Sequence, residues 1–184
     1  MKTKLLYVLV SNRNDVYLEQ AHISIHSAKY YMPDCHVTLL VDETTDMDMD
    51  DNRRKILSNV DEYIVISLTE GTNSQQRSRL LKCGARKYVK GDFLFIDTDT
   101  IIARPLYEID VITSSIAATR DSHSDFLLNP YREMCIEHGK KLEWPIEEES
   151  MYFNSGVLFV KDDEAAHRFY DMWLEEWKKV KKRV

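Results

Sequence analysis

The sequence has few of the residues that mark tight turns, zinc sites and disulfide frameworks. Only five of its 184 residues are glycine and four are proline, which argues against a sandwich of many short strands. Its three cysteines, Cys35, Cys83 and Cys135, lie far apart and form no Cys-x-x-Cys pair. This spacing predicts reduced, partly buried thiols rather than a zinc site or a disulfide framework, and it favours a cytoplasmic location.

Long apolar runs and an excess of positive charge are also missing. No stretch approaches the roughly 20 apolar residues that cross a bilayer. The apolar run Leu5–Val10 is short, and polar residues follow it where a signal peptide would have small ones. We therefore interpret this run as a buried strand. The formal net charge of −6 makes a nucleic-acid partner unfavourable, and we expect none.

What the sequence does contain is an alternation of apolar runs and segments with helical spacing. The runs with strand character are Leu5–Val10, Val37–Val41, Tyr63–Ile66, Phe93–Ile96, Ile116–Thr119 and Val157–Val160. Helical spacing predicts a first helix from a cap at Asn14 or Asp15 to Pro33, and a second from the acidic segment Asp46–Asp51 to near Val60. A third is expected from a cap at Ser74 to Gly91 and a fourth over Tyr131–His138. The last follows a cap at Asp162 or Asp163. The last helix should bury Ala166, Phe169, Trp173, Trp177 and Val180 on one face. The alternation predicts one α/β domain over residues 1–184, with a mostly parallel sheet flanked by helices.

Two acidic residues directly follow the fourth expected strand. Phe93–Ile96 runs into Asp97-Thr98-Asp99, and open α/β sheets bind ligands at the carboxyl ends of their strands. Side chains two residues apart in an extended chain point the same way, so both carboxylates are expected to face one Mg²⁺ or Mn²⁺ ion. Such an ion would neutralise a departing diphosphate. A polar turn is the alternative, but a turn needs no pair of carboxylates directly after a strand.

Four segments, in order, resemble those of the GT-A-fold, nucleotide-sugar-dependent glycosyltransferases. The likeness is to the retaining family of glycogenin and the bacterial galactosyl- and glucosyltransferases of lipopolysaccharide synthesis, and it covers residues 5 to about 175. Asn14–Tyr17 is similar to the segment that holds the nucleoside, and Asp97–Asp99 to the metal-binding Asp-x-Asp. Ile116–Asp121 resembles the strand whose last Asp contacts the donor sugar. Tyr152–Val160 resembles the Phe-Asn-Ser-Gly-Val segment beside the reacting carbon.

The resemblance implies a site for a nucleoside diphosphate sugar, most readily a UDP-sugar, with Mn²⁺ or Mg²⁺. Asp97 and Asp99 would hold the metal, and Asp121 and Asn154 would be the catalytic residues beside the sugar. The implied reaction transfers a hexose, with retention of configuration, to a hydroxyl of a glycan or lipid-linked acceptor. The donor-binding residues that it implies are Ser11, Asp15, Tyr17, Arg79, Asp97 and Thr98.

Residue types alone leave several alternatives open in this site. The ring of Tyr17 could stack on a base or pack into the core. Arg77 and Arg79 could bind phosphate oxygens from the start of their helix, or both could be solvated. Gly156 either allows the backbone to approach a ligand closely or only marks a turn.

The sequence departs from the family after the last expected helix. Family members continue with a segment that supplies acceptor contacts and a histidine as third protein ligand to the metal. This sequence ends at Val184, and none of its six histidines lies in that context. The chain is therefore expected to be short at its C-terminus, with three interpretations: fewer protein ligands to the metal, a fragment, or impaired activity. The basic tail Lys178–Arg183 either contacts the inner face of an anionic membrane peripherally or complements the helix dipole.

Two other functions remain as alternatives. Phe93–Thr100 also fits the first motif of the haloacid-dehalogenase-like phosphatases, in which Asp97 would attack phosphorus and Asp99 would act as general acid and base. That motif normally opens its domain, whereas three strand–helix units precede it here, and it leaves Asn14–Tyr17 and Asn154–Gly156 unexplained. The other alternative is a non-catalytic relic that binds a sugar nucleotide.

Overall fold

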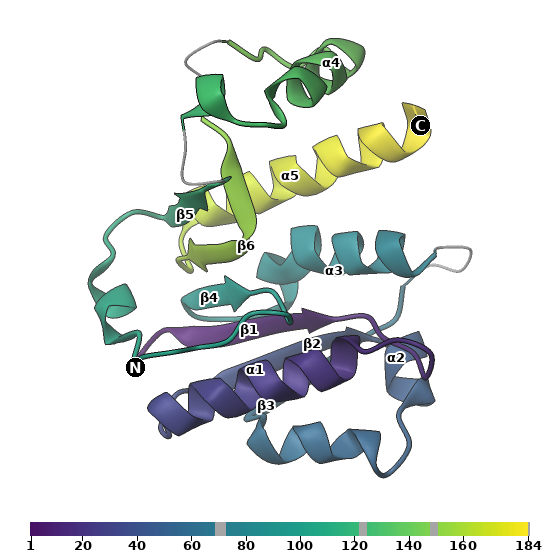
Figure 1. Ribbon diagram of the computed structural model, residues 1–184, viewed down its shortest axis with the longest axis vertical. Helices are drawn as coiled ribbons and strands as arrows, with labels where there is room; N and C mark the ends of the chain where they lie inside the picture. Colours follow the sequence, from purple (N-terminus) through teal and green to yellow (C-terminus); the bar gives the residue numbers. More distant parts are fainter. Residues whose placement is uncertain (69–72, 122–124, 148–150, 184) are drawn as a thin grey trace.

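The chain forms a six-stranded mixed sheet with helices on both faces (Figure 1). The computed structural model describes residues 1–68, 73–121, 125–147 and 151–183. Residues 181–183 are described by their backbone alone. The strand order is β3-β2-β1-β4-β6-β5. The strands are β1 Lys4–Leu9, β2 Val37–Asp42, β3 Glu62–Ile66, β4 Phe93–Ile96, β5 Ile116–Arg120 and β6 Phe153–Val160. All six lie where apolar runs predicted them, and β6 begins four residues earlier than expected.

The helices connect these strands as the alternation predicted. The α-helices are α1 Tyr17–Tyr31, α2 Glu43–Asp48, α3 Ser74–Tyr88, α4 Arg132–Leu142 and α5 Glu164–Arg183. The 3₁₀ helices among the described residues are η1 Arg53–Asn59, η2 Tyr107–Val111 and η4 Phe126–Leu128. β1, β2, β3 and β4 are parallel, whereas β6 runs antiparallel to both β4 and β5. The prediction of a mostly parallel α/β sheet is therefore confirmed.

Strand β1 explains why the two helical layers form. Leu5, Tyr7 and Leu9 pack into the core under α1, while Leu6 and Val8 pack into the core under α3 and α5. Alternate side chains of a strand point to opposite faces of its sheet, so an uninterrupted apolar run requires a cover on each face. Figure 1 shows α1 and α3 on opposite sides of the central strands.

Helix ends and one helical segment differ from the predictions. Residue Val16, not Asn14 or Asp15, precedes α1 as its N-cap, and Asn73 rather than Ser74 caps α3 through the amide of Gln76. The single helix expected from the acidic segment to Val60 is instead α2 followed by η1. Asp163 accepts the Ala166 amide at 2.9 Å, as one of the two predicted caps of α5.

The buried face of α5 is also rotated relative to the prediction. Tyr170 and Leu174 are buried with Ala166, whereas Phe169 is 41% exposed and contacts the rings of Tyr170 and Trp173. Within the described residues, no helix has both the length and the apolar character needed to cross a bilayer. The side chains of residues 181–183 in the basic tail lie outside the described residues.

The three cysteines match the expectation of unpaired thiols. Cys35 and Cys83 are buried and Cys135 is partly buried, and all three are free. Burial raises the pKa of the Cys83 thiol to about 11, which keeps it protonated at neutral pH.

Candidate active site

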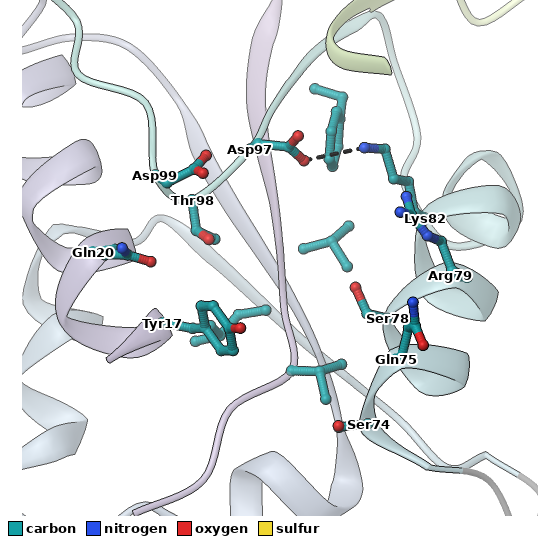
Figure 2. Close-up of a pocket in the computed structure, with 14 residues that line it drawn as sticks. Tyr17, Gln20, Ser74, Gln75, Ser78, Arg79, Lys82, Asp97, Thr98 and Asp99 are labelled. Atoms are coloured by element: carbon teal, nitrogen blue, oxygen red, sulfur yellow. Dashed lines mark hydrogen bonds and ion pairs between the residues drawn. The ribbon is translucent and has the colours of Figure 1, made fainter. Parts of the chain in front are cut away.

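A cavity of about 440 Å³ opens at the carboxyl ends of β1 and β4, between α1 and α3 (Figure 2). This volume falls within the roughly 300–1,000 Å³ of small-molecule sites, and the location is where open α/β sheets bind ligands. Four of the predicted donor-binding residues and both predicted metal ligands line it. The full lining is Val8, Leu9, Val10, Tyr17, Gln20, Ser74, Gln75, Ser78, Arg79, Lys82, Phe95, Asp97, Thr98 and Asp99.

One wall of the cavity is a polar face of α3. Its lining residues recur at spacings of three and four, which places them on one side of a helix. The wall is hydroxyl- and amide-bearing at the helix N-terminus and cationic one to two turns later, at Arg79 and Lys82. The dipole of α3 adds partial positive charge at this N-terminus. This wall therefore favours a ligand with a polar end and an anionic end.

The opposite side of the cavity, next to α1, carries an aromatic ring. Tyr17 is the first residue of α1 and is 53% exposed, so it is not packed in the core, the alternative that its residue type left open. In Figure 2, Tyr17 and Gln20 face the polar wall of α3 across the cavity. A flat, solvent-accessible ring in this position can stack on a planar group of a ligand.

The acidic pair forms a turn rather than a continuation of β4. The Thr100 amide donates to the Asp97 carbonyl at 3.2 Å, which closes a four-residue turn. The expectation of an extended chain with parallel side chains was therefore wrong. Asp97 extends toward α3, and Asp99 stands on the α1 side of it (Figure 2). Both carboxylates nevertheless line the same cavity.

Asp97 is paired with a buried lysine that the sequence reasoning missed. The Lys82 ammonium lies 3.1 Å from Asp97 Oδ1 and 4.4 Å from the centre of the Phe95 ring. Burial lowers the pKa of Lys82, and the negative charge of Asp97 opposes that shift. Lys82 follows two leucines and precedes Cys83, Gly84 and Ala85, so a cation within an otherwise buried helical stretch was the available signal.

Gly156 connects Asp97 to the predicted sugar-binding residues. The Asp97 amide donates to the Gly156 carbonyl at 2.8 Å, and the Gly156 amide donates to Asn154 Oδ1 at 2.6 Å. A Cβ atom at position 156 would lie 2.6 Å from Asp97 Oδ2. Gly156 therefore lies inside β6 rather than in a turn, and the group that approaches it closely is a protein carboxylate. Its close approach to a ligand stays a prediction.

Asn154 and Asp121 lie together but outside the lining of the cavity. Asn154 Nδ2 donates to Asp121 Oδ1 at 3.3 Å. An irregularity in the strand pairing brings them here: Ala118 pairs with Leu158 and Arg120 with Phe153, so only residue 119 of β5 faces residues 154–157 of β6. This four-residue segment leaves the β5 ladder and turns toward Asp97, as bulges beside active sites often do.

Ser11 and Asp15 organise the loop that precedes Tyr17. Asp15 accepts the Ser11 hydroxyl at 2.6 Å, the Asn12 amide at 2.9 Å and the Tyr17 amide at 3.2 Å. Arg53 Nη2 donates to the Ser11 hydroxyl at 2.8 Å. Both predicted donor-binding residues are thus engaged within the protein, and neither belongs to the cavity lining. Their observed contacts fix the start of α1 and therefore the position of the Tyr17 ring.

The two arginines at the start of α3 have different surroundings. Arg77 Nε lies 2.5 Å from the buried carboxylate of Asp42 at the end of β2, which ties α3 to the sheet. Arg79 is exposed and lines the cavity. Of the two arginines, Arg79 is therefore the one whose side chain lines the cavity, and its binding to phosphate oxygens stays a prediction.

The acidic pair offers two carboxylates to a divalent cation. Within the described residues, no group of three or more His, Cys, Asp or Glu side chains is placed to hold a metal ion. Mg²⁺ commonly binds through one or two carboxylates while substrate phosphates and water supply its other ligands. Asp97 and Asp99, which line the same cavity, match that ligand set in number and chemical type.

Comparison with known proteins identifies the fold. No known family model and no curated protein sequence matches the chain, but solved structures do. The galactosyltransferase LgtC, solved with donor and acceptor sugar analogs, aligns with a TM-score of 0.63 at 13% identity, over 97% of this chain and 66% of LgtC.

Two further structures agree. The glycosyltransferase GlyE of Streptococcus pneumoniae TIGR4 aligns with a TM-score of 0.58 at 16% identity, over 99% of this chain and 40% of GlyE. The mannosyltransferase Ktr4p of S. cerevisiae, solved with GDP, aligns with a TM-score of 0.50 at 12% identity, over 96% of this chain and 61% of Ktr4p. The chain spans less than two thirds of each enzyme. Its fold is that of the GT-A-like glycosyltransferases.

Proposed function

We propose that this chain binds a nucleoside diphosphate sugar in the cavity between α1 and α3 and transfers the hexose to an acceptor hydroxyl. The observation that carries the proposal is the order of groups along the cavity. An exposed tyrosine ring and the helix N-terminus lie at one end, and two cations and two carboxylates lie at the other. A base, a ribose and a diphosphate present complementary groups in that order.

Each wall has a role in this proposal. Tyr17 stacks on the base, which the family resemblance makes uracil, and Arg79 binds phosphate oxygens. Asp97, with Thr98 beside it, and Asp99 hold Mn²⁺ or Mg²⁺, which when bound supplies positive charge against the departing diphosphate. Ser11 and Asp15 support the nucleoside end by fixing the start of α1.

The sugar itself is assigned to the segment beside the cavity. Asn154 and Asp121 are hydrogen-bonded to each other and offer amide and carboxylate groups to sugar hydroxyls. Their link through Gly156 to Asp97 puts them next to the phosphate end of the donor. Retention of configuration and a glycan or lipid-linked acceptor are part of the proposal through the family resemblance alone.

The first test is titration calorimetry with UDP and GDP, each with and without Mn²⁺. The wild type is expected to bind UDP in an Mn²⁺-dependent manner. Asp97→Asn and Asp99→Asn should each weaken that binding at least about 100-fold, because even indirect partners of metal ligands are worth about 10- to 100-fold. Asp34→Asn, an exposed acid after α1, is the matched control and should bind as the wild type does.

The contrary result is equally clear. Absence of UDP and GDP binding, together with hydrolysis of a generic phosphomonoester in Mg²⁺, would replace the proposal with the phosphatase. Nucleotide binding without turnover of any UDP-sugar would favour the non-catalytic relic.

The assignment of the sugar is tested separately with Asn154→Ala. This variant should bind UDP with unchanged affinity because Asn154 does not line the cavity. Release of hexose from a UDP-sugar should fall at least about tenfold, the scale of one lost hydrogen bond to the transition state. Equal losses of UDP affinity and turnover would place Asn154 in nucleotide binding instead.

A further inference from the structure

The most deeply buried charge in the cavity wall belongs to Lys82. Its side chain is 7% exposed, whereas that of its partner Asp97 is 45% exposed. The ammonium lies over the Phe95 ring at 4.4 Å and next to Asp97 Oδ1 at 3.1 Å. Strand β4 and the turn that follows it therefore hold this cation from two sides.

In this position the Lys82 ammonium competes with a divalent cation for the carboxylate of Asp97. Asp97 Oδ1 already contacts the ammonium, and Oδ2 lies against the backbone of Gly156. A metal ion on Asp97 would bring two further positive charges within a few ångströms of Nζ, where the repulsion between charges is substantial even near a protein surface.

A second cation on the same wall points to what balances that repulsion. Arg79 and Lys82 are three residues apart on α3, so their side chains share one face of the helix. Their positive charges interact unfavourably, and both line the cavity. An anion bound between these two side chains and the acidic pair would attract Arg79, Lys82 and the divalent cation together and would offset the repulsion among them.

We propose that Lys82 is a positioning residue that makes metal binding depend on the diphosphate of the donor. Its charge weakens the binding of a divalent cation by Asp97 and Asp99 alone, and the same charge strengthens the binding of the diphosphate. Nucleotide and cation therefore bind cooperatively rather than independently. This inference rests on the proposed function and assigns to it a further binding residue.

The test compares Lys82→Met and Lys82→Gln with the wild type in two separate titrations. Mn²⁺ alone is followed by the electron paramagnetic resonance of the free ion, and UDP alone by calorimetry. Both variants should bind Mn²⁺ at least about tenfold more tightly and metal-free UDP at least about tenfold more weakly, the scale of one charge at this distance. The factor by which each ligand improves the other's affinity should fall equally for both.

Lys87→Met is the matched control, because Lys87 lies on the same helix, is 48% exposed and pairs with Asp171 away from the cavity. It should bind both ligands as the wild type does. The opposite signs of the two effects separate a charge role from a packing role, since a damaged cavity would weaken both ligands. Unchanged Mn²⁺ affinity in both Lys82 variants, or a loss of both affinities, would overturn the inference.

The proposed function can fail separately. If the wild type binds neither UDP nor GDP under any condition, the proposed function is wrong, and the diphosphate part of this inference is overturned with it. If nucleotide binds with Mn²⁺ but the Lys82 variants behave as the wild type, only the inference is wrong.

Discussion

The central strands of the sheet and the end formed by β5 and β6 are built differently. In β1, β2 and β4 nearly every side chain is buried, whereas β5 and the first three residues of β6 are exposed or partly exposed. The cavity opens at the ends of the buried strands β1 and β4, and its charged residues come from α3 and from the turn after β4. Of the predicted sugar-binding residues, Asp121 directly follows β5 and Asn154 lies in the exposed start of β6. Gly156 is where the two regions meet.

This difference separates two requirements of a transferase site. The phosphate end needs fixed charges, and fixed charges need a rigid, close-packed support. The sugar end lies on strands with little buried surface, which can differ in sequence at little cost to stability. Three predictions test whether the two regions are as distinct as their burial indicates, starting with the largest effect.

The first prediction compares the same substitution in each region. Phe93 in β4 is fully buried against the Arg86 guanidinium and the Tyr170 ring, whereas Phe153 at the start of β6 is 44% exposed. Phe93→Ala should lower the free energy of unfolding by about 3–5 kcal/mol because it leaves a cavity in the core. Phe153→Ala should lower it by at most about 1 kcal/mol. Urea unfolding followed by circular dichroism measures both. Equal losses would mean that the outer strands belong to the same core.

The second prediction acts where the two regions meet. In Gly156→Ala, the new Cβ atom would lie 2.6 Å from Asp97 Oδ2 and 2.9 Å from Asn154 Oδ1. Both are ends of movable side chains, so the fold should survive at a cost of about 1 kcal/mol. The displaced carboxylate should weaken Mn²⁺-dependent UDP binding at least about tenfold, as calorimetry would report.

Gly84→Ala provides the matched control for that substitution. Its Cβ atom would meet only the ring of Tyr88 at 3.3 Å, and position 84 lies in α3 away from the cavity lining. UDP binding should be unchanged in this variant. If Gly156→Ala also leaves UDP binding unchanged, the contact between Gly156 and Asp97 has no role in nucleotide binding.

The strands and the approximate place of the site follow from the sequence because they depend on local patterns. Each strand is an apolar run, and the acidic pair directly follows one of them. The orientation of that pair does not follow, because it depends on the backbone hydrogen bond from Thr100 to Asp97. The start of α1 was mispredicted for a similar reason, since Asp15 bonds to Ser11 and Asn12 as well as to the Tyr17 amide and lies one residue before the cap position.

The positions of Lys82 and of the Asn154–Gly156 segment could not be predicted because they depend on contacts between distant parts of the chain. A single lysine in a helix is ordinarily solvated, and only the packing of α3 on β4 buries this one against Phe95. The segment approaches Asp97 because β6 pairs with β4 up to Val157 and Ile96, and an irregular register separates it from β5. Nothing in the composition of these strands specifies that pairing.

The smallest expected effect concerns how β6 is attached to the buried strands. Asp162, just after β6, accepts the Gly91 amide at 2.6 Å and lies 2.8 Å from a ring nitrogen of His167. These contacts, the one with His167 first, lower the pKa of the Asp162 carboxyl. Its charge therefore stabilises the folded state above the ordinary pKa of about 3.9, and that contribution is lost as the pH falls through the lower pKa of the folded state.

The corresponding variant is Asp162→Asn, measured by urea unfolding from neutral pH to about pH 2. At neutral pH it should be less stable than the wild type by at most about 1 kcal/mol, because one charged hydrogen-bond acceptor is lost at a partly exposed site. The difference should persist down to about pH 4 and vanish below it. A difference that stays constant across the whole range would show that the amide side chain disturbs the junction sterically. In that case the attachment of β6 to the buried strands depends on packing around Asp162 and not on the charge of its carboxylate.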